Sequence, residues 1–232
     1  MRVALLTTDT SHHAYYAWKL AERFPLAAIV LETDPIVPPF EVAHPFEERR
    51  DAFEREHLAG FGGPLTELAQ VHEAPRVAEA EALLRALSPD AAIVFGTRIV
   101  PPDVASISSV CLNLHGGNPE HYRGLDTHLW AIYHGDFANL VTTLHVVDDG
   151  LDTGAIVAQT SPALYRGMEL HELRVANTQA CVELTGLALD ALEANGRVPA
   201  RPQLQRGRYY SFMPSVLKER CVERFAIHTA GL

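Results

Sequence analysis

Short apolar runs alternate with helical patterns along the first hundred residues. Residues 3–6, 27–31 and 91–95 are continuous apolar runs, and residues 68–71 form a weaker one. Helical patterns over residues 13–23 and 77–87 lie between them. Continuous apolar strands that alternate with helices are typical of a parallel sheet covered on both faces. The pattern therefore predicts an α/β fold with a Rossmann-like, mostly parallel sheet.

The second half of the chain predicts a different arrangement of strands. Residues 110–115 alternate into a strand, residues 126–134 form a helix, and the strands predicted at 141–147 and 155–158 are an antiparallel pair. The longest helical pattern covers residues 168–194, with Gly196 as its C-cap. Leu170, Leu173, Val182, Leu184, Leu187 and Leu192 are predicted on or near one face. A helix over residues 214–225 is predicted as a short C-terminal appendage.

One segment carries polar rather than apolar residues. Residues 34–63 contain four prolines, and residues 45–58 are dense in charge. We predict a solvated helix that joins core elements. The alternative is that residues 45–60 form a lid over a pocket.

Composition and charge narrow the class of partner. The chain has 232 residues, of which 47% are hydrophobic, so we expect one globular unit. Its net charge of −10 disfavours binding to nucleic acid and favours a small-molecule partner. Three cysteines without a CxxC pair predict neither a disulfide framework nor a zinc ribbon. No apolar stretch approaches a membrane span, so we expect a cytoplasmic protein without a membrane partner.

Three polar residues are the candidates for chemistry. Asn113 and His115 end a predicted strand, and Asp152 follows in a glycine-flanked turn. An amide, an imidazole and a carboxylate suit acyl transfer to an external amine, which needs an oxyanion donor and a proton acceptor. The alternative is structural, with Asn113 capping a turn and His115 satisfied within the core. The first strand–helix loop has no GxGxxG, so a dinucleotide is not expected.

The order and spacing of several motifs around these residues resemble the folate-dependent formyltransferase family. That family includes methionyl-tRNA, glycinamide ribonucleotide and sugar N-formyltransferases. The motifs are Asn113-Leu114-His115, Tyr122-Arg123-Gly124, Trp130-Ala131-Ile132, Gly135, Thr143-Leu144-His145 and Leu151-Asp152-Thr153-Gly154. The resemblance covers residues 1 to about 195 and predicts a catalytic domain over residues 1–196, followed by a C-terminal extension over residues 197–232.

The resemblance implies a donor and a set of roles. N10-formyltetrahydrofolate is the implied donor, and Asn113, His115 and Asp152 match the catalytic residues of the family. Asn113 and His115 would polarise the formyl oxygen, while Asp152 would orient His115, keep it basic and help to deprotonate the amine. The positions that match the folate-binding backbone are Phe95, Gly96, Arg98, Ile99, Asp148 and Leu151.

The acceptor side departs from the family pattern. The loop after His115 reads Gly116-Gly117-Asn118-Pro119 where the family commonly has serine, two aliphatic residues and proline. We predict a more flexible loop that borders the acceptor. The candidate substrate-binding residues are His12, His13, Tyr16, Gly116, Gly117 and Tyr209. A helix N-terminus capped by Thr10 or Ser11, and a surface hairpin at Tyr209-Tyr210 used for packing or dimerisation, are alternative interpretations.

These features together predict an N-formyltransferase that acts on a primary amine of a small molecule, with a nucleotide-linked or antibiotic amino sugar as the leading candidate. Glycinamide ribonucleotide is disfavoured because the first loop lacks a glycine-rich phosphate cradle. The tRNA-directed enzyme is disfavoured by the net charge and by the roughly thirty residues after Gly196, where that enzyme has a further domain. The alternatives are a formyltetrahydrofolate hydrolase, a methionyl-tRNA formyltransferase-like enzyme, a nucleotide-binding oxidoreductase and a catalytically silent binding module.

Two further questions concern metals and oligomers. His115, His121, His128 and His134 recur every six or seven residues, which does not match the spacing of a helical zinc pair. We therefore predict no metal site. A homodimer is left open by the sequence.

Overall fold

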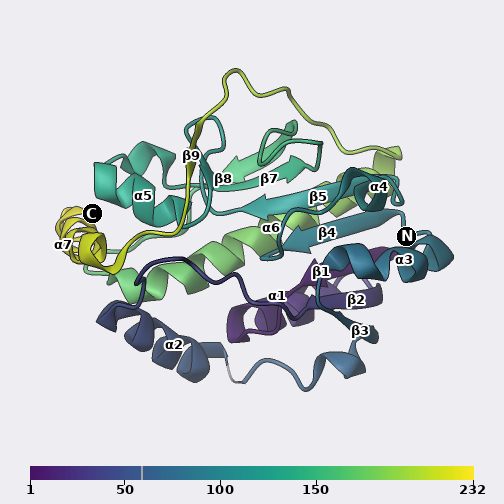
Figure 1. The fold of residues 1–232 in the computed structure, drawn as a ribbon, viewed down its shortest axis with the longest axis horizontal. Helices are drawn as coiled ribbons and strands as arrows, with labels where there is room; N and C mark the ends of the chain where they lie inside the picture. Colours follow the sequence, from purple (N-terminus) through teal and green to yellow (C-terminus); the bar gives the residue numbers. More distant parts are fainter. Residues whose placement is uncertain (59) are drawn as a thin grey trace.

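A seven-stranded sheet forms the centre of the computed structural model, which describes residues 1–58 and 60–232 (Figure 1). The strand order is β3-β2-β1-β4-β5-β7-β8. Strands β3, β2, β1, β4 and β5 are parallel, and β7 runs antiparallel to both of its neighbours, β5 and β8. The strands are β1 (Val3–Thr7), β2 (Leu26–Glu32), β3 (Gln70–Ala74), β4 (Ala91–Phe95), β5 (Val110–His115), β7 (Thr142–Val146) and β8 (Ile156–Thr160). The predicted mostly parallel α/β fold is confirmed.

Helices cover both faces of this sheet, which explains the continuous apolar strands. On one face, α1 (Ser11–Ala21) and α6 (Leu173–Asn195) pack against side chains such as Leu5 and Ile93. On the other face lie a 3₁₀ turn (η2, Val77–Ala80), α3 (Glu81–Leu87) and α4 (Pro102–Ala105). Because the central strands β1 and β4 are buried from both sides, apolar residues at every position of these strands are favoured.

A third apolar cluster joins segments that are far apart in sequence. It contains Phe46 of α2 (Pro45–Leu58), Ile132 of α5 (Thr127–His134) and Phe225 of α7 (Ser215–Ala230). The Lys218 side chain of α7 is only 1% exposed and donates to Val42 O (2.6 Å) and to Glu47 Oε1 of α2 (2.8 Å). These contacts hold α2 against the C-terminal helix.

The segment after α6 contains a short strand that pairs with a strand from the middle of the sequence. β9 (Arg208–Tyr210) pairs in parallel with β6 (Tyr122–Gly124), so Tyr209-Tyr210 is not part of a hairpin. Gly124 has φ +98°, and a Cβ there would lie 2.1 Å from the Tyr210 carbonyl oxygen, so only glycine permits this close pairing. The division of the chain at residue 196 stays a prediction.

Several predicted boundaries differ from the observed ones. The strand predicted at 68–71 begins at Gln70, because a 3₁₀ turn (η1, Leu65–Glu67) precedes it. The long helix predicted from residue 168 begins at Leu173, after a 3₁₀ turn (η4, Leu170–Glu172) with a capping box between Glu169 and Glu172. Leu187, predicted on or near the apolar face of that helix, is 63% exposed.

The charged segment 45–58 is the helix α2, as the sequence predicts, but it is not simply solvated. Its residues Phe46, Glu54 and Leu58 are buried, and it contacts α1 and η4. The lid predicted over residues 45–60 includes residue 59, which lies outside the described residues. Across the described part of the chain, none of the helices combines the length and apolar character needed to span a membrane.

Candidate active site

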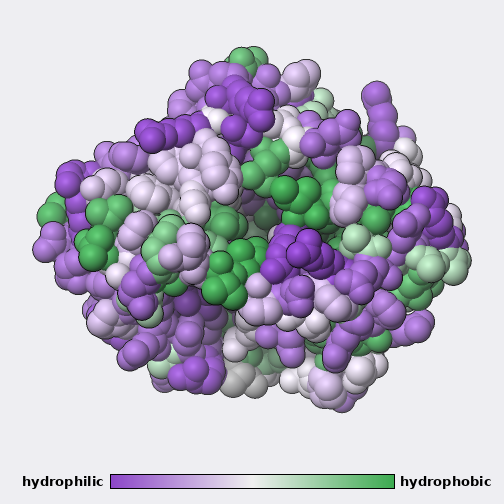
Figure 2. Space-filling model, viewed as in Figure 1, coloured by the Kyte–Doolittle hydropathy of each residue, from purple (hydrophilic) through white to green (hydrophobic). Residues whose placement is uncertain are grey.

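A large open cavity of about 870 Å³ lies at the carboxyl edge of the parallel strands. Figure 2 shows the molecular face hollowed near its centre, between apolar side chains. A smaller cavity of about 80 Å³ adjoins the large one. Asn113 and Asp152 line both cavities, as do Thr97, Arg98, Ile99 and Leu151. Open α/β sheets commonly bind ligands at this edge.

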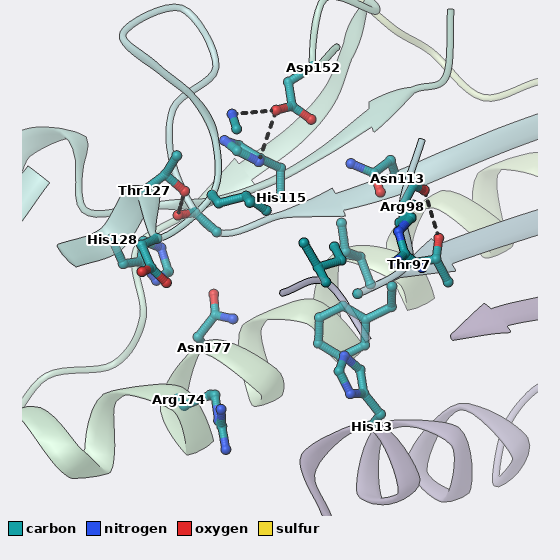
Figure 3. Close-up of a pocket in the computed structure, with 18 of the residues that line it drawn as sticks. His13, Thr97, Arg98, Asn113, His115, Thr127, His128, Asp152, Arg174 and Asn177 are labelled. Atoms are coloured by element: carbon teal, nitrogen blue, oxygen red, sulfur yellow. Dashed lines mark hydrogen bonds and ion pairs between the residues drawn. The ribbon is translucent and has the colours of Figure 1, made fainter. Parts of the chain in front are cut away.

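The three candidate catalytic residues come together at the boundary between the cavities. Asn113 and His115 are two residues apart on β5, so they share one side of the strand. Asp152 belongs to the turn after β7 and has φ +52°. Its Oδ2 lies 3.7 Å from His115 Nδ1 and accepts a hydrogen bond from the Gly124 N–H at 2.8 Å (Figure 3).

His145 of β7 lies between Asn113 and Asp152. Its Nε2 lies 3.1 Å from Asn113 Nδ2 and 3.6 Å from Asp152 Oδ1. His145 belongs to the motif Thr143-Leu144-His145, from which no role could be assigned. Its alternation with Thr143 on a strand next to β5 was the signal that could have identified it.

Backbone carbonyls fix the tautomers of both histidines. His115 Nε2 lies 2.8 Å from the Tyr122 carbonyl oxygen, which can only accept, so the ring hydrogen is assigned to Nε2. Nδ1 of the neutral ring is then a bare lone pair that faces Asp152. His145 Nδ1 donates to the Val146 carbonyl oxygen (2.9 Å) in the same way, which leaves its Nε2 to accept from the Asn113 amide.

Burial and charge set the ionisation of this pair. Burial lowers the pKa of His115 below its usual value, although the carboxylate of Asp152 opposes this shift. Burial alone would raise the pKa of Asp152, but attraction to His115, the neighbouring His145 and the hydrogen bond from the Gly124 N–H hold that pKa low, at about 2. At neutral pH the site therefore holds a neutral imidazole beside a carboxylate, an arrangement that accepts a proton and stabilises it.

This arrangement predicts how His115 titrates. In the free protein its pKa is expected below 6.5, so the ring is protonated only as the pH falls through that lower value. Asp152→Asn removes the carboxylate that raises the pKa and is expected to move it lower still. An NMR titration of the labelled imidazole checks both results. A His115 pKa above 7 in the native protein would contradict the electrostatic argument.

The predicted folate-binding positions divide between the two cavities. Phe95, Gly96, Arg98, Ile99 and Leu151 line the large cavity, whereas Asp148 lines only the small one. The loop after β4 is held by the buried Glu32, whose Oε1 accepts from the Arg98 N–H (2.9 Å). The Arg98 guanidinium donates to the carbonyl oxygens of Asp34 and Pro35. Arg98 therefore contributes a fixed backbone rather than a free charge.

Four of the six predicted substrate-binding residues line the large cavity. They are His12, His13, Gly116 and Tyr209. Tyr16 does not, because it lies on the core side of α1, is fully buried and hydrogen-bonds Thr185 Oγ1 through its hydroxyl (2.7 Å). Gly117 does not line it either, and its carbonyl oxygen accepts from Thr143 Oγ1 (2.6 Å). The structure therefore does not bring these two residues to the cavity.

Thr10 begins α1 without a side-chain cap. Its hydroxyl instead contacts Nδ1 of His12 (2.9 Å) and of His13 (2.7 Å), at the cavity. The alternative interpretation in which Thr10 caps the helix through its side chain is therefore wrong.

Other cavity residues had no distinguishing signal in the sequence. Asn177 and Arg174 of α6 and Thr127 and His128 of α5 line the large cavity. Arg174 forms an ion pair with the buried Glu54, which also lies 3.6 Å from His12 Nδ1. Among residues 1–58 and 60–232, no group of histidines, cysteines and acidic residues is arranged to hold a metal ion.

The fold and site define an α/β protein with an amide, an imidazole and a carboxylate at the edge shared by two cavities. The model of the formyl transferase family matches residues 45–182, more than half of the chain. The protein therefore belongs to the formyl transferase family, and the resemblance predicted from its motifs is confirmed.

Individual relatives agree with this assignment. The methionyl-tRNA formyltransferase of Trichlorobacter lovleyi is 32% identical over 166 residues, which cover 67% of this chain and 51% of that protein. The chain thus spans about half the length of the curated relatives it matches.

Solved structures of formyltransferases share the fold. A 4-N formyltransferase from Francisella tularensis superposes with a TM-score of 0.62 at 14% identity, covering 96% of this chain and 86% of that one. The formyltransferase PseJ from Anoxybacillus kamchatkensis has a TM-score of 0.50 at 20% identity, covering 91% and 86%. That structure contains tetrahydrofolate and UDP-4,6-dideoxy-4-formamido-L-AltNAc. At these identities the likeness concerns the fold alone.

Proposed function

We propose that this protein transfers a formyl group from N10-formyltetrahydrofolate to a primary amine of a small molecule, with an amino sugar as the leading acceptor. The observation that carries the proposal is the position of Asn113, His115 and Asp152. They lie where a small and a large cavity meet, so two substrates can approach one carbon from different sides.

The donor would lie against the two loops that border the small cavity. The residues on its walls come from the loop after β4, around Thr97–Val100, and from the turn around Val147–Leu151. Such loops offer backbone donors and acceptors to a flat heterocycle. The tetrahydrofolate in the structure of PseJ supports a folate as the donor.

The chemistry would use the residues as the structure orients them. The acceptor nitrogen attacks the formyl carbon, and an Asn113 amide hydrogen stabilises the negative charge that develops on the formyl oxygen. His115 Nδ1 takes a proton from the attacking nitrogen, with Asp152 stabilising the resulting imidazolium. That proton passes to N10 as the bond between N10 and the formyl carbon breaks. The products are a formamide and tetrahydrofolate.

This assignment differs from the sequence-based role of His115. The sequence analysis gave His115 a part in polarising the formyl oxygen. In the neutral ring, however, its single N–H is donated to the Tyr122 carbonyl oxygen. The proposal therefore makes His115 the base and leaves the oxyanion to Asn113.

The acceptor would occupy the large cavity, whose volume of about 870 Å³ suits a small molecule. The sugar nucleotide in the PseJ structure supports an amino sugar. The matches to methionyl-tRNA formyltransferases favour the second candidate, a methionyl-tRNA acceptor. The net charge of −10 counts against a polyanionic acceptor. A cytoplasmic location and a homodimer stay predictions.

An acceptor panel tests the proposal. Consumption of N10-formyltetrahydrofolate is expected to rise with free or nucleotide-linked amino sugars and to be unchanged by charged initiator tRNA. The measurement is tetrahydrofolate release together with mass detection of the formamide. Stimulation by the tRNA alone would overturn the small-amine assignment, and equal consumption without any acceptor would indicate hydrolysis instead.

A further inference from the structure

Three consecutive residues at the start of α5 line the large cavity next to the catalytic strand. They are Asp126, Thr127 and His128. Figure 3 shows Thr127 and His128 on one side of the cavity, across from Thr97 and Arg98. The sequence analysis gave none of the three a role.

Short distances place this segment beside His115. A Cβ added to Gly116 would lie 3.4 Å from His128 Nδ1, and one added to Gly117 would lie 3.4 Å from His115 Nε2. The two glycines therefore separate the catalytic imidazole from the His128 ring by a single layer of backbone. A group bound to His128 would lie next to the reacting amine.

The polar hydrogens of His128 and Thr127 are already donated within the protein. His128 Nε2 donates to the Val141 carbonyl oxygen (2.7 Å), so the ring hydrogen is on Nε2. The Thr127 hydroxyl donates to the Gly116 carbonyl oxygen (2.6 Å). Burial lowers the pKa of His128 to about 4, so the ring is neutral at physiological pH. Its Nδ1 is then a lone pair.

That lone pair is directed to the cavity. Every buried side-chain nitrogen or oxygen within the described residues has a hydrogen-bond partner. Nδ1 of His128 has none in the same part of the chain, so this nitrogen is not fully buried, and it belongs to a residue that lines the large cavity. As a hydrogen-bond acceptor, such a lone pair binds an N–H or O–H group.

Asp126 adds further acceptor atoms. Its Oδ2 accepts the Met213 N–H at 2.8 Å, and a carboxylate has no hydrogen to donate. The cations near Asp126 are Lys218, which is hydrogen-bonded to Val42 O and Glu47, and Arg50, which is paired with Asp51 and Glu47. The side chains of Asp126, Thr127 and His128 therefore offer the cavity acceptors and no donors.

We propose that Asp126, Thr127 and His128 form an acceptor subsite that binds hydroxyl or amino groups flanking the reacting amine and selects against an anionic group at that position. This inference rests on the proposed transfer to a small amine. Polyhydroxylated amines such as amino sugars present O–H groups there. A carboxylate or phosphate would place lone pairs and negative charge against other lone pairs.

Matched amines test the subsite in the unmodified protein. The probes are trans-2-aminocyclohexanol, cyclohexylamine, trans-2-fluorocyclohexylamine and trans-2-aminocyclohexanecarboxylate. We expect kcat/KM for the amino alcohol to exceed that of cyclohexylamine by about 10-fold or more, as for one good hydrogen bond. The fluoro compound has a lone pair but no hydrogen, so it should gain nothing, and the carboxylate should react least. Equal values for the amino alcohol and cyclohexylamine, or a preference for the carboxylate, would overturn the inference.

A variant separates the subsite from the rest of the site. His128→Phe keeps a ring of similar shape and is expected to bring the ratio between the amino alcohol and cyclohexylamine close to one, without changing affinity for a folate analogue. His134→Phe, on the same helix but outside the cavity, should keep the wild-type ratio. An unchanged ratio in His128→Phe contradicts the subsite.

The test of the subsite does not depend on whether His128→Phe folds. If His128→Phe does not fold, the comparison of the four amines in the unmodified protein decides. The two proposals also fail differently. Loss of folate binding and of transfer to every amine would reject the proposed function, whereas transfer without discrimination among the four amines would reject only the subsite.

Discussion

His115→Ala is expected to lower kcat by about 10³-fold, within the range for a general base, while affinity for a non-reactive folate analogue changes little. The position of His115 explains why kcat should fall while affinity for the folate analogue is kept. Nδ1 of His115 is the proposed proton acceptor that faces Asp152, whereas His115 itself does not line the small cavity. Removal of the ring therefore removes the proton transfer and leaves the donor site.

Single-turnover kinetics and calorimetric titration with a folate analogue measure the two effects. Asp152→Asn is expected to behave similarly, since it removes the charge that stabilises the imidazolium but keeps the size of the side chain. His134→Ala provides a matched control, because this histidine is exposed at the end of α5. Turnover close to normal in either active-site variant would refute the assigned roles.

Arg174→Met is expected to lower the free energy of unfolding by about 3–5 kcal/mol at neutral pH. Glu54 is 2% exposed, and Arg174 donates to both of its carboxylate oxygens, one at 2.7 Å and the other through Nε. Without the guanidinium, a buried charge loses its main partner. His12 at 3.6 Å does not replace it, because burial lowers the pKa of that imidazole and keeps it neutral.

The contribution of the Glu54–Arg174 pair to the free energy of unfolding is expected to depend on pH. Burial alone would raise the pKa of Glu54, but His12 and Arg174 hold it at about 2, below the usual 4.5. In the wild type this pair therefore contributes stability above pH 4.5 that is lost as the pH falls toward 2. In Arg174→Met the pKa of Glu54 in the folded state rises. The variant's loss of unfolding free energy relative to wild type should therefore be smaller at pH 4 than at pH 7.

Urea denaturation at both pH values measures the deficit. Glu54→Gln/Arg174→Met should be more stable than Arg174→Met, since the double variant leaves no buried charge. A single variant that is less stable than wild type by under about 1 kcal/mol would show that Glu54 finds another cation or solvent.

The sequence by itself determined the class of fold and the family. Residues 3–6, 27–31 and 91–95 predicted buried strands because a strand covered on both faces favours apolar residues at every position. Asn113 and His115 could be assigned to one side of a strand because side chains two residues apart point the same way. The order of the motifs from Asn113 to Gly154 predicted the formyl transferase family. All of these are properties of local periodicity or of spacing along the chain.

Contacts between distant segments were decided only by the tertiary structure. The sequence could not distinguish Tyr16, which packs in the core, from His12 and His13 at the cavity, because helix position alone does not say which face meets the sheet. Likewise, β9 pairs with β6 rather than forming a hairpin, and α7 reaches α2 through the buried Lys218.

The chemistry of the site depends on such contacts most of all. Which nitrogen of His115 carries the hydrogen is decided by the Tyr122 carbonyl oxygen, and for His128 by that of Val141. Burial and the distance to Asp152 then set whether the His115 ring accepts a proton. Residue identity supplies the imidazole and carboxylate, but hydrogen-bond direction and desolvation are properties of neighbours in space, so only the folded chain assigns their roles.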